Sequence, residues 1–309
     1  MRFGCLPPGS VAPMARFGRV LSAMVTPFDD NGALDLDTAV ELARWLVDHG
    51  NDGLVVAGTT GEASTLDDDE HLDLVAAVAE AVTVPVVAGV GGNDTRHTVF
   101  MARQAAARGA AGLLAVCPYY NRPGQAGIEA HFRAVAEATD LPVVIYDIPV
   151  RTGRKVTTAT LLRLAHEVPN VLALKDAAGN PGETASVIAA APDGFEVYSG
   201  DDSLTLPLLA VGAVGVIGVA THWTGEDHQE MFDLWDKGDV AAARAVNARL
   251  LASFAFETGD EAPNPIPTKV MMRHLGVPVG EARLPLGPAP AWVAERAATV
   301  WDDLVAARA

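Results

Sequence analysis

Short runs of β-branched and aliphatic residues alternate with longer Ala- and Leu-rich stretches along most of the chain. Such runs predict buried strands, at residues 21–25, 53–57, 84–88, 112–116, 143–146, 171–175, 196–199 and 215–219. The stretches between them predict helices, and three of these, at residues 37–48, 67–82 and 94–108, begin with Asp37, Asp67 and Asp94. Because an aspartate there accepts hydrogen bonds from free backbone N–H groups, we expect these three residues to be N-caps.

Strands that alternate with helices form a parallel sheet with right-handed crossovers. Eight such units in about 220 residues predict an α/β protein with a closed (β/α)8, or TIM, barrel. A doubly wound open sheet is the alternative, but no G-x-G-x-x-G follows the first run. Residues 240–257, 268–274 and 291–309 predict further helices. The expected organisation is therefore a tail over residues 1–18, a barrel over 19–238 and a C-terminal helical extension over 239–309.

The N-terminal tail has an unusual composition. Residues 1–13 contain three prolines and no continuous apolar segment, so they do not predict a signal peptide. The segment that starts at Met14 reads as a natural beginning that leads directly into the first strand. We expect residues 1–18 to be a disordered tail, or a segment that results from assigning the start codon too far upstream.

Composition and charge narrow the class of protein. Half of the 309 residues are hydrophobic, which is enough for a large core. The net charge is −17, and a surface this acidic repels nucleic acid and anionic lipid. The longest apolar stretch, residues 206–220, contains three glycines and is shorter than the roughly 20 residues of a membrane span. Cys5 and Cys117 cannot form a disulfide framework. We therefore expect a soluble, cytoplasmic protein.

Two reactive side chains fall at the carboxyl ends of predicted strands, where the active sites of barrels lie. In the sixth run, alternation puts Lys175 on the face of Ala173, opposite Leu172 and Leu174. If the leucines face the helices, Lys175 points into the barrel mouth, where loss of hydration makes its amine a nucleophile for a ketone. Tyr146 ends the fifth run and is placed to transfer protons beside it. A lysine that extends to solvent and a barrel-filling aromatic ring are the alternatives.

Three loops after strands carry candidate site residues, and two of these loops suit a carboxylate substrate. The loop after the second run reads GTTGE, and its backbone N–H groups and the hydroxyls of Thr59 and Thr60 can surround a carboxylate. Arg151 follows the fifth run, where a guanidinium suits bidentate binding. An ordinary turn and a surface arginine are the alternatives. Tyr119 and Tyr120 cannot both point inward, so one is expected to cover the site or to contact a partner subunit.

Metal chemistry has little support in the sequence. The eight histidines are dispersed, His222 and His228 lack the i, i+4 spacing of a helical metal site, and no H-E-x-x-H occurs. Cys117 has no neighbouring Cys or His, which predicts a small buried hydrophobic residue. We expect neither a metal nor another cofactor.

Several segments together form a recognisable set. They are AMVTPF (23–28), GTTGEASTL (58–66), PYYNR (118–122), YDIPVRTG (146–153), LKDAAG (174–179), SGDD (199–202), GVIGVA (215–220), NPIPTK (264–269) and RLPL (283–286). With this set the chain resembles the dihydrodipicolinate synthase family, within the N-acetylneuraminate lyase superfamily of class I aldolases. The resemblance extends over residues 19–286, and the joint pattern is far more specific than any one segment.

The resemblance implies condensation of pyruvate with L-aspartate 4-semialdehyde to 4-hydroxy-tetrahydrodipicolinate, in lysine and diaminopimelate biosynthesis. Lys175 corresponds to the Schiff-base lysine that binds pyruvate, without a metal or other cofactor. Tyr146 and Thr60, with Tyr120 from a neighbouring subunit, correspond to the proton relay. The resemblance also implies a homotetramer built from tight dimers.

The substrate-binding residues of the family also have counterparts. Thr59 and Thr60 correspond to the loop that holds the pyruvate carboxylate, Arg151 to the residue that binds the aspartate semialdehyde carboxylate, and Gly200 and Ile217 to the pyruvate side of the site. N-acetylneuraminate lyases and 2-keto-3-deoxy sugar acid aldolases share the lysine and the tyrosine. They usually differ at the threonine pair and lack the arginine, so the synthase is favoured. The sequence also leaves open a non-catalytic pyruvate-binding sensor and a metal-dependent aldolase.

The chain departs from the family pattern at a few positions. Asp147 replaces the commoner asparagine, and Thr221–His222 differs from the usual segment, which leaves substrate preference open. In lysine-inhibited relatives, a cleft at the dimer interface binds the amino acid. Its counterparts here are His71, Asn93 and Tyr119, whereas Asp68 and His97 replace the usual histidine and glutamate. Because a carboxylate that would pair with the ammonium is lost, we expect weak feedback inhibition by lysine.

Overall fold

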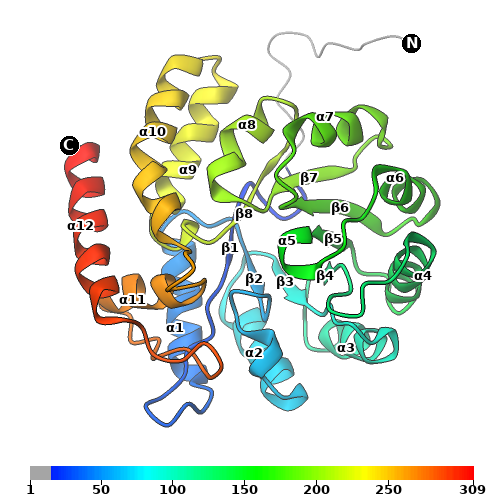
Figure 1. The fold of residues 1–309 in the computed structure, drawn as a ribbon, viewed down its shortest axis with the longest axis horizontal. Helices are drawn as coiled ribbons and strands as arrows, with labels where there is room; N and C mark the ends of the chain where they lie inside the picture. The colour runs from blue at the N-terminus through cyan, green and yellow to red at the C-terminus, as the bar shows by residue number, and fades with distance from the viewer. Residues whose placement is uncertain (1–14) are drawn as a thin grey trace.

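Eight parallel strands form a closed barrel in the computed structural model, which describes residues 15–309 (Figure 1). The strands are β1 (Val20–Ala23), β2 (Gly53–Val56), β3 (Val86–Gly89), β4 (Gly112–Val116), β5 (Val143–Asp147), β6 (Val171–Asp176), β7 (Glu196–Ser199) and β8 (Gly215–Gly218). Each strand pairs with the next, and β8 closes the barrel on β1, where Val20 lies opposite Val216. The predicted (β/α)8 barrel is confirmed, and the open-sheet alternative is wrong.

Helices follow the strands and surround the barrel (Figure 1). They are α1 (Leu36–Asp48), α2 (Asp68–Ala81), α3 (Thr95–Ala107), α4 (Gln125–Ala136), α5 (Pro149–Thr152), α6 (Thr158–Glu167), α7 (Pro181–Ala190), α8 (Thr205–Leu209) and α9 (Thr221–Asp236). Asp67 and Asp94 are the N-caps of α2 and α3, as predicted. For α1 the prediction is wrong by two residues. Asp35 is its N-cap and accepts a hydrogen bond from the Thr38 N–H, while Asp37 lies in the first turn.

Alternation along the strands sorts the side chains into two apolar layers. Leu174 belongs to the layer between strands and helices, whereas Ala173 belongs to the barrel interior, together with Ile217. Lys175 therefore lies on the interior face, as the alternation predicts. Phe17 fills the amino end of the barrel, because a Cβ on Gly112, the first residue of β4, would lie 2.6 Å from its ring. The carboxyl end of the barrel is therefore the end at which we look for a functional site.

A second apolar cluster joins the C-terminal helices α10 (Val240–Phe256), α11 (Ile266–His274) and α12 (Ala291–Arg308) to the barrel. In Figure 1 these helices lie beside α1 and α9. The cluster contains Val20 and Val216 from the strands as well as Met271 and Val293 from the C-terminal helices. Because this core is continuous, we retain the division at residue 238 only as a proposal. Of the tail predicted over residues 1–18, residues 1–14 lie outside the described residues, whereas Phe17 is 2% exposed and packs in the barrel interior.

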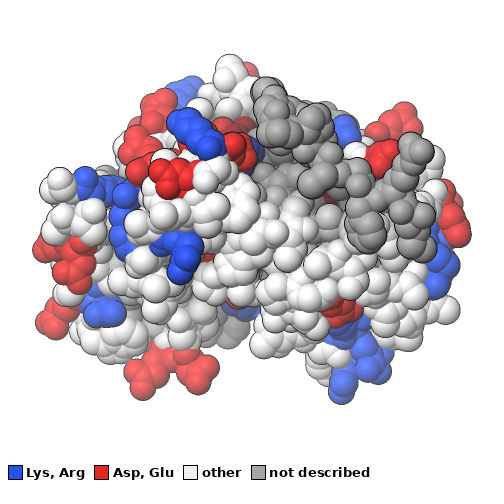
Figure 2. Space-filling model, turned by 90° about the horizontal axis from the view of Figure 1, so that it is seen from above, with Lys and Arg blue, Asp and Glu red and all other residues white. Residues whose placement is uncertain are grey.

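Charged side chains are unevenly distributed over one face of the molecule. On the face drawn in Figure 2, acidic and basic side chains gather toward the margins, and the centre is largely uncharged. Among the helices within residues 15–309, none is both long and apolar enough to cross a membrane. Cys117 is buried, as predicted.

Candidate active site

Lys175 and Tyr146 lie side by side at the carboxyl end of the barrel. They are direct partners in the register between β5 and β6, and the Lys175 Nζ lies 4.4 Å from the centre of the Tyr146 ring. Lys175 is only 4% exposed, so it does not extend to solvent. Burial lowers the pKa of its amine to about 8, against the raising effect of the Asp202 and Glu257 carboxyls. The amine is therefore largely neutral at mildly alkaline pH and is available as a nucleophile.

Tyr146 is also buried and faces a cavity of about 300 Å³. Burial raises the pKa of its phenol well above the usual range, although the charge of Arg151 partly opposes this. The phenol keeps its proton at neutral pH and can donate it or pass it on. The cavity lies over the loops that follow β2 to β5, and its wall includes Thr59, Tyr146 and Arg151.

The threonine loop is fixed from a distant part of the chain. Thr59 is exposed and lines the cavity, whereas Thr60 is buried. The Oγ1 atom of Thr60 accepts a hydrogen bond of 2.9 Å from the Nδ2 of Asn264, which precedes α11. Two residues after Thr60, the carboxylate of Glu62 lies 2.7 Å from the Nζ of Lys269, in α11. The C-terminal segment thus holds the loop that carries the hydroxyls.

Arg151 and the tyrosine pair lie at the mouth of the cavity. Arg151 belongs to the short helix α5 and lines the cavity with an exposed side chain. Of the two consecutive tyrosines, Tyr119 lines the cavity. Tyr120 is 88% exposed, and its φ of 69° is unusual for a bulky residue. The structure therefore brings Tyr119, and not Tyr120, to the cavity of its own chain.

Gly200 and Ile217 complete the surroundings of Lys175. A Cβ on Gly200 would lie 2.9 Å from the Cγ of Lys175 and 3.1 Å from its Cε, so a side chain there would displace the lysine. Ile217 is fully buried in β8 and packs in the same interior cluster as Tyr146. The residues with a predicted role in the site therefore lie at or near the carboxyl end of one barrel, and of these Thr59, Tyr146 and Arg151 line the cavity.

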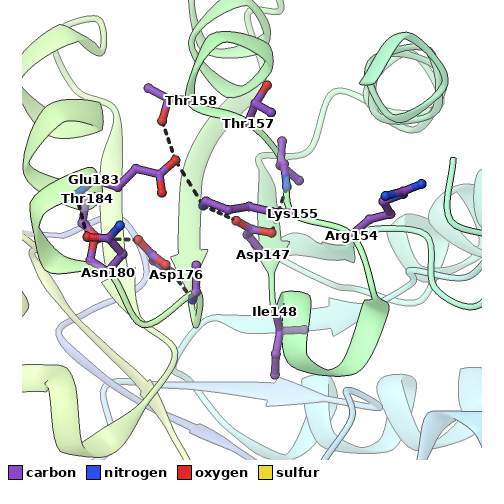
Figure 3. A network of polar contacts seen from close by, with 12 residues as sticks. Asp147, Ile148, Arg154, Lys155, Thr157, Thr158, Asp176, Asn180, Glu183 and Thr184 are labelled. Atoms are coloured by element: carbon purple, nitrogen blue, oxygen red, sulfur yellow. Dashed lines mark hydrogen bonds and ion pairs between the residues drawn. The ribbon is translucent and has the colours of Figure 1, made fainter. Parts of the chain in front are cut away.

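Two of the departures from the family pattern, Asp147 and His222, lie outside the cavity, whereas Asp68 and His97 line it. Asp147 follows Tyr146 and so points to the helix side of β5, where its carboxylate accepts hydrogen bonds from the Lys155 Nζ at 2.9 Å and the Val156 N–H at 3.0 Å. Figure 3 shows the Lys155 ammonium between Asp147 and Glu183. Asp147 is therefore part of a packing network and does not reach a substrate in the cavity.

His222 has a similarly structural place. Its Nδ1–H donates to the Val219 carbonyl at 2.7 Å, and its Nε2 accepts from the Val25 N–H at 3.2 Å. Burial lowers the pKa of His222 to about 4, so the ring is neutral. Within residues 15–309, no group of three or more His, Cys, Asp or Glu side chains is arranged to hold a metal ion.

Sequence reasoning gave no role to four residues that support this site. They are Asp202, Glu257, Asn264 and Lys269. Three of them belong to segments that carried the resemblance, SGDD and NPIPTK, but nothing local in either segment indicates that its side chains reach the loops near Lys175. Glu257 had no signal at all.

Comparison with known proteins agrees with the geometry. The model of the dihydrodipicolinate synthetase family matches residues 16–299. The 4-hydroxy-tetrahydrodipicolinate synthase of Acidothermus cellulolyticus is 51% identical over 297 residues, which are 95% of this chain and 93% of that protein. The enzyme of the same name from Moorella thermoacetica is 49% identical over 275 residues, or 88% and 92% of the two chains.

Solved structures give the same result. The dihydrodipicolinate synthase from Cyanidioschyzon merolae, determined with lysine bound, superposes with a TM-score of 0.91 at 41% identity, covering 94% of this chain and 99% of that one. The chloride-inhibited enzyme from Acinetobacter baumannii, complexed with pyruvate, gives a TM-score of 0.88 at 32% identity, with the same coverage.

Proposed function

The chain belongs to the dihydrodipicolinate synthetase family and has 4-hydroxy-tetrahydrodipicolinate synthase activity, and we propose that Lys175 carries this reaction by forming an imine with pyruvate. The observation that supports this most directly is a buried lysine, with a pKa lowered to about 8, beside a buried tyrosine at the carboxyl end of the barrel. A neutral amine in that place attacks a ketone, whereas an ammonium cannot.

The steps follow from this chemistry. The Lys175 amine attacks C2 of pyruvate and water leaves, so that a protonated imine forms. This imine draws electrons from the methyl group, which loses a proton and gives an enamine. The enamine carbon attacks the aldehyde of aspartate semialdehyde, whose oxygen takes up a proton. The amine of the second substrate then displaces Lys175 from C2 and closes the six-membered ring.

The proton transfers are assigned to a relay of hydroxyl groups. Tyr146 keeps its proton because burial raises the pKa of its phenol, and it lies against Lys175. The hydroxyl of Thr60 is oriented by Asn264. Tyr120 of a neighbouring subunit is assigned the outer position, which its exposure on its own chain supports. The relay thus moves protons between the imine and solvent.

The binding roles are assigned to two sets of residues, one for each substrate. Thr59 and Thr60 are assigned to the pyruvate carboxylate, with Gly200 and Ile217 on the pyruvate side. Arg151 is assigned to the carboxylate of aspartate semialdehyde, and its place on the cavity wall supports this.

A substrate panel tests the proposed reaction. The purified chain is incubated with pyruvate and, in separate reactions, aspartate semialdehyde, N-acetylmannosamine or glyceraldehyde, and the products are identified by mass. Of the three aldehydes, only aspartate semialdehyde is expected to condense rapidly with pyruvate. Preference for either sugar-derived aldehyde would instead indicate one of the sister aldolases. Binding of pyruvate without turnover of any aldehyde would indicate a sensor, and loss of turnover in EDTA a metal-dependent aldolase.

Arg151→Ala is expected to weaken the use of aspartate semialdehyde by about 10- to 100-fold in kcat/KM, because a charge-assisted contact of about 1.5–3 kcal/mol is lost. Trapping of the pyruvate imine with borohydride is expected to change far less. Arg151→Lys is the matched control, since it keeps the charge but loses the bidentate fork. Equal damage to imine formation and to the second half-reaction would assign Arg151 a structural role.

We also propose a homotetramer of tight dimers in which Tyr120 acts across the dimer boundary. Tyr120→Phe and Lys175→Ala chains are each expected to be nearly inactive. When they are mixed, a hybrid dimer holds one site with both an intact Lys175 and an intact Tyr120, so part of the activity is expected to return. Native mass spectrometry verifies that the subunits exchange. If exchange occurs without recovery of activity, Tyr120 does not act in the neighbouring site.

Feedback inhibition by lysine is expected to be weak. The Asp68 carboxylate, which could bind the ammonium of lysine, lies 2.9 Å from the Nε2 of His97 and is already paired with it. Burial lowers the pKa of His71, and its Nε2 contacts the Gly89 carbonyl at 2.7 Å. Initial rates in millimolar lysine measure the effect. His97→Glu restores the usual carboxylate and is expected to strengthen inhibition by about 10- to 100-fold. Inhibition of the unmodified chain by micromolar lysine would contradict this expectation.

A further inference from the structure

Two carboxyl groups meet behind Lys175, between β7 and β8. Asp202 opens the short 3-10 turn Asp202–Leu204 after β7, and its Oδ2 accepts a hydrogen bond of 2.8 Å from the Val219 N–H. Glu257 follows the last residue of α10, and its Oε2 accepts one of 3.1 Å from the next amide, that of Ala220. Because consecutive amides, those of Val219 and Ala220, bind the two groups, the carboxyls are held near one another.

One oxygen of this pair lacks a partner. Asp202 is 1% exposed, and among residues 15–309 its Oδ1 has no hydrogen-bond donor. A buried acceptor without a donor is costly. Two adjacent buried carboxylates are also costly when both are charged. A single proton on Glu257, donated to the Oδ1 of Asp202, removes both costs. Burial and the neighbouring Asp202 raise the pKa of Glu257 well above its usual range, in agreement with that proton.

Asp202 packs closely against β8. A Cβ on Gly218 would overlap the Oδ1 of Asp202, so glycine is needed there for the pair to fit. The groups that act on the charge of Lys175 are Asp202 from its turn, Glu257 from the end of α10 and Arg151 from α5, and the Tyr146 ring packs against its Nζ. The two carboxyls favour a cation at Lys175, and Arg151 opposes it. Asp201 acts on Glu257.

We propose that Asp202 and Glu257 share one proton and together place a single negative charge behind Lys175, as the counter-charge of the iminium ion formed there. This inference rests on the proposed role of Lys175. The two carboxyls are positioning residues, because they act on the substrate only through the lysine. When pyruvate is bound, the imine nitrogen keeps its positive charge, and the pair stabilises this charge without giving up or accepting a proton.

Sharing one proton has a distinctive consequence for substitutions. In Glu257→Gln, the amide replaces the donor to Asp202, and the charge stays on Asp202. In Asp202→Asn, the amide donates to Glu257, and the charge moves to Glu257. Each single variant therefore retains one negative charge, and only the double variant Asp202→Asn/Glu257→Gln removes it. The effects of the two substitutions are then strongly non-additive.

The test measures the pH dependence of borohydride trapping of pyruvate, read by intact mass without the second substrate. In the unmodified chain and in both single variants, the midpoint of the rate is expected at nearly the same pH. In the double variant it is expected about one unit lower, a tenfold change in the ratio of amine to ammonium, because the cation at Lys175 has lost its counter-charge. Asp201→Asn removes a neighbouring carboxylate that is not part of the pair and is the matched control, with an unchanged midpoint expected.

Other outcomes overturn the proposal. Shifts in the single variants that add up to the shift of the double variant would show two independent charges. An unshifted double variant would show that the pair does not act on the lysine. If the double variant does not fold, Glu257→Gln still decides, because a midpoint at clearly lower pH would show that Glu257 carries a charge of its own. If the unmodified chain forms no adduct at all, it is the proposed function that fails, and not this inference.

Discussion

Lys175→Ala is expected to lower turnover by at least about 10³-fold, because the residue proposed to form the covalent intermediate is lost and the remaining groups can only bind and orient the substrates. In the unmodified chain, pyruvate and borohydride are expected to add one reduced three-carbon adduct, detected by intact mass and located by peptide mapping. The variant is expected to gain none. The rate of trapping should rise with pH through about 8, since burial lowers the pKa of Lys175 to about 8 and only the neutral amine attacks.

A second lysine provides the control for this experiment. Lys155 is partly buried near the same end of the barrel, but its ammonium is held by Asp147 at 2.9 Å and Glu183 at 3.5 Å (Figure 3). Its pKa is raised, since these two carboxylates together outweigh the effect of burial. Lys155→Met is therefore expected to form the adduct at the normal rate. An adduct on any lysine other than Lys175, or turnover that survives in Lys175→Ala, would contradict the assignment.

The sequence predicts the barrel well, because each strand and each helix is indicated by the residues within its own segment. Each strand is an apolar run, and each helix is a longer Ala- and Leu-rich stretch. The alternation of residues 172–175 puts Lys175 on the face opposite Leu174, and Leu174 packs on the helix side. The predicted N-cap of α1 is wrong because the residues within one segment do not fix where a helix begins. Asp35 and Asp37 are both reasonable caps locally, and the actual choice depends on where the loop after β1 turns.

The support of the site could not be predicted in this way. Thr60 depends on Asn264, 204 residues further along the chain. The pairing of Asp202 with Glu257 depends on how the end of α10 packs beside β8. Neither spacing nor periodicity carries such information, since it arises only when the C-terminal helices dock on the barrel. The resemblance identified segments that contain Asn264 and Asp202, but it did not indicate which side chains contact the catalytic loops.

The ion pair between Glu62 and Lys269 is the clearest case of such support, and breaking it is expected to destabilise the fold strongly. The two side chains are 0% and 1% exposed, and their charged atoms lie 2.7 Å apart. Lys269→Met leaves the Glu62 carboxylate buried without its cation. Removal of one partner of a buried pair costs about 3–5 kcal/mol, so the free energy of unfolding from urea titration is expected to fall by that amount.

The double variant Glu62→Gln/Lys269→Met distinguishes loss of the pair from loss of packing. It removes both charges and keeps the side-chain volumes similar, so most of the lost stability is expected to return. Activity is expected to recover less, because Glu62 also accepts a hydrogen bond of 2.9 Å from the Arg283 N–H and shapes the loop that carries Thr60. Arg273→Met, which breaks the more exposed pair of Arg273 with Glu281, is the control and is expected to cost less than about 1 kcal/mol. If Lys269→Met costs no more than this control, the buried pair does not hold the loop.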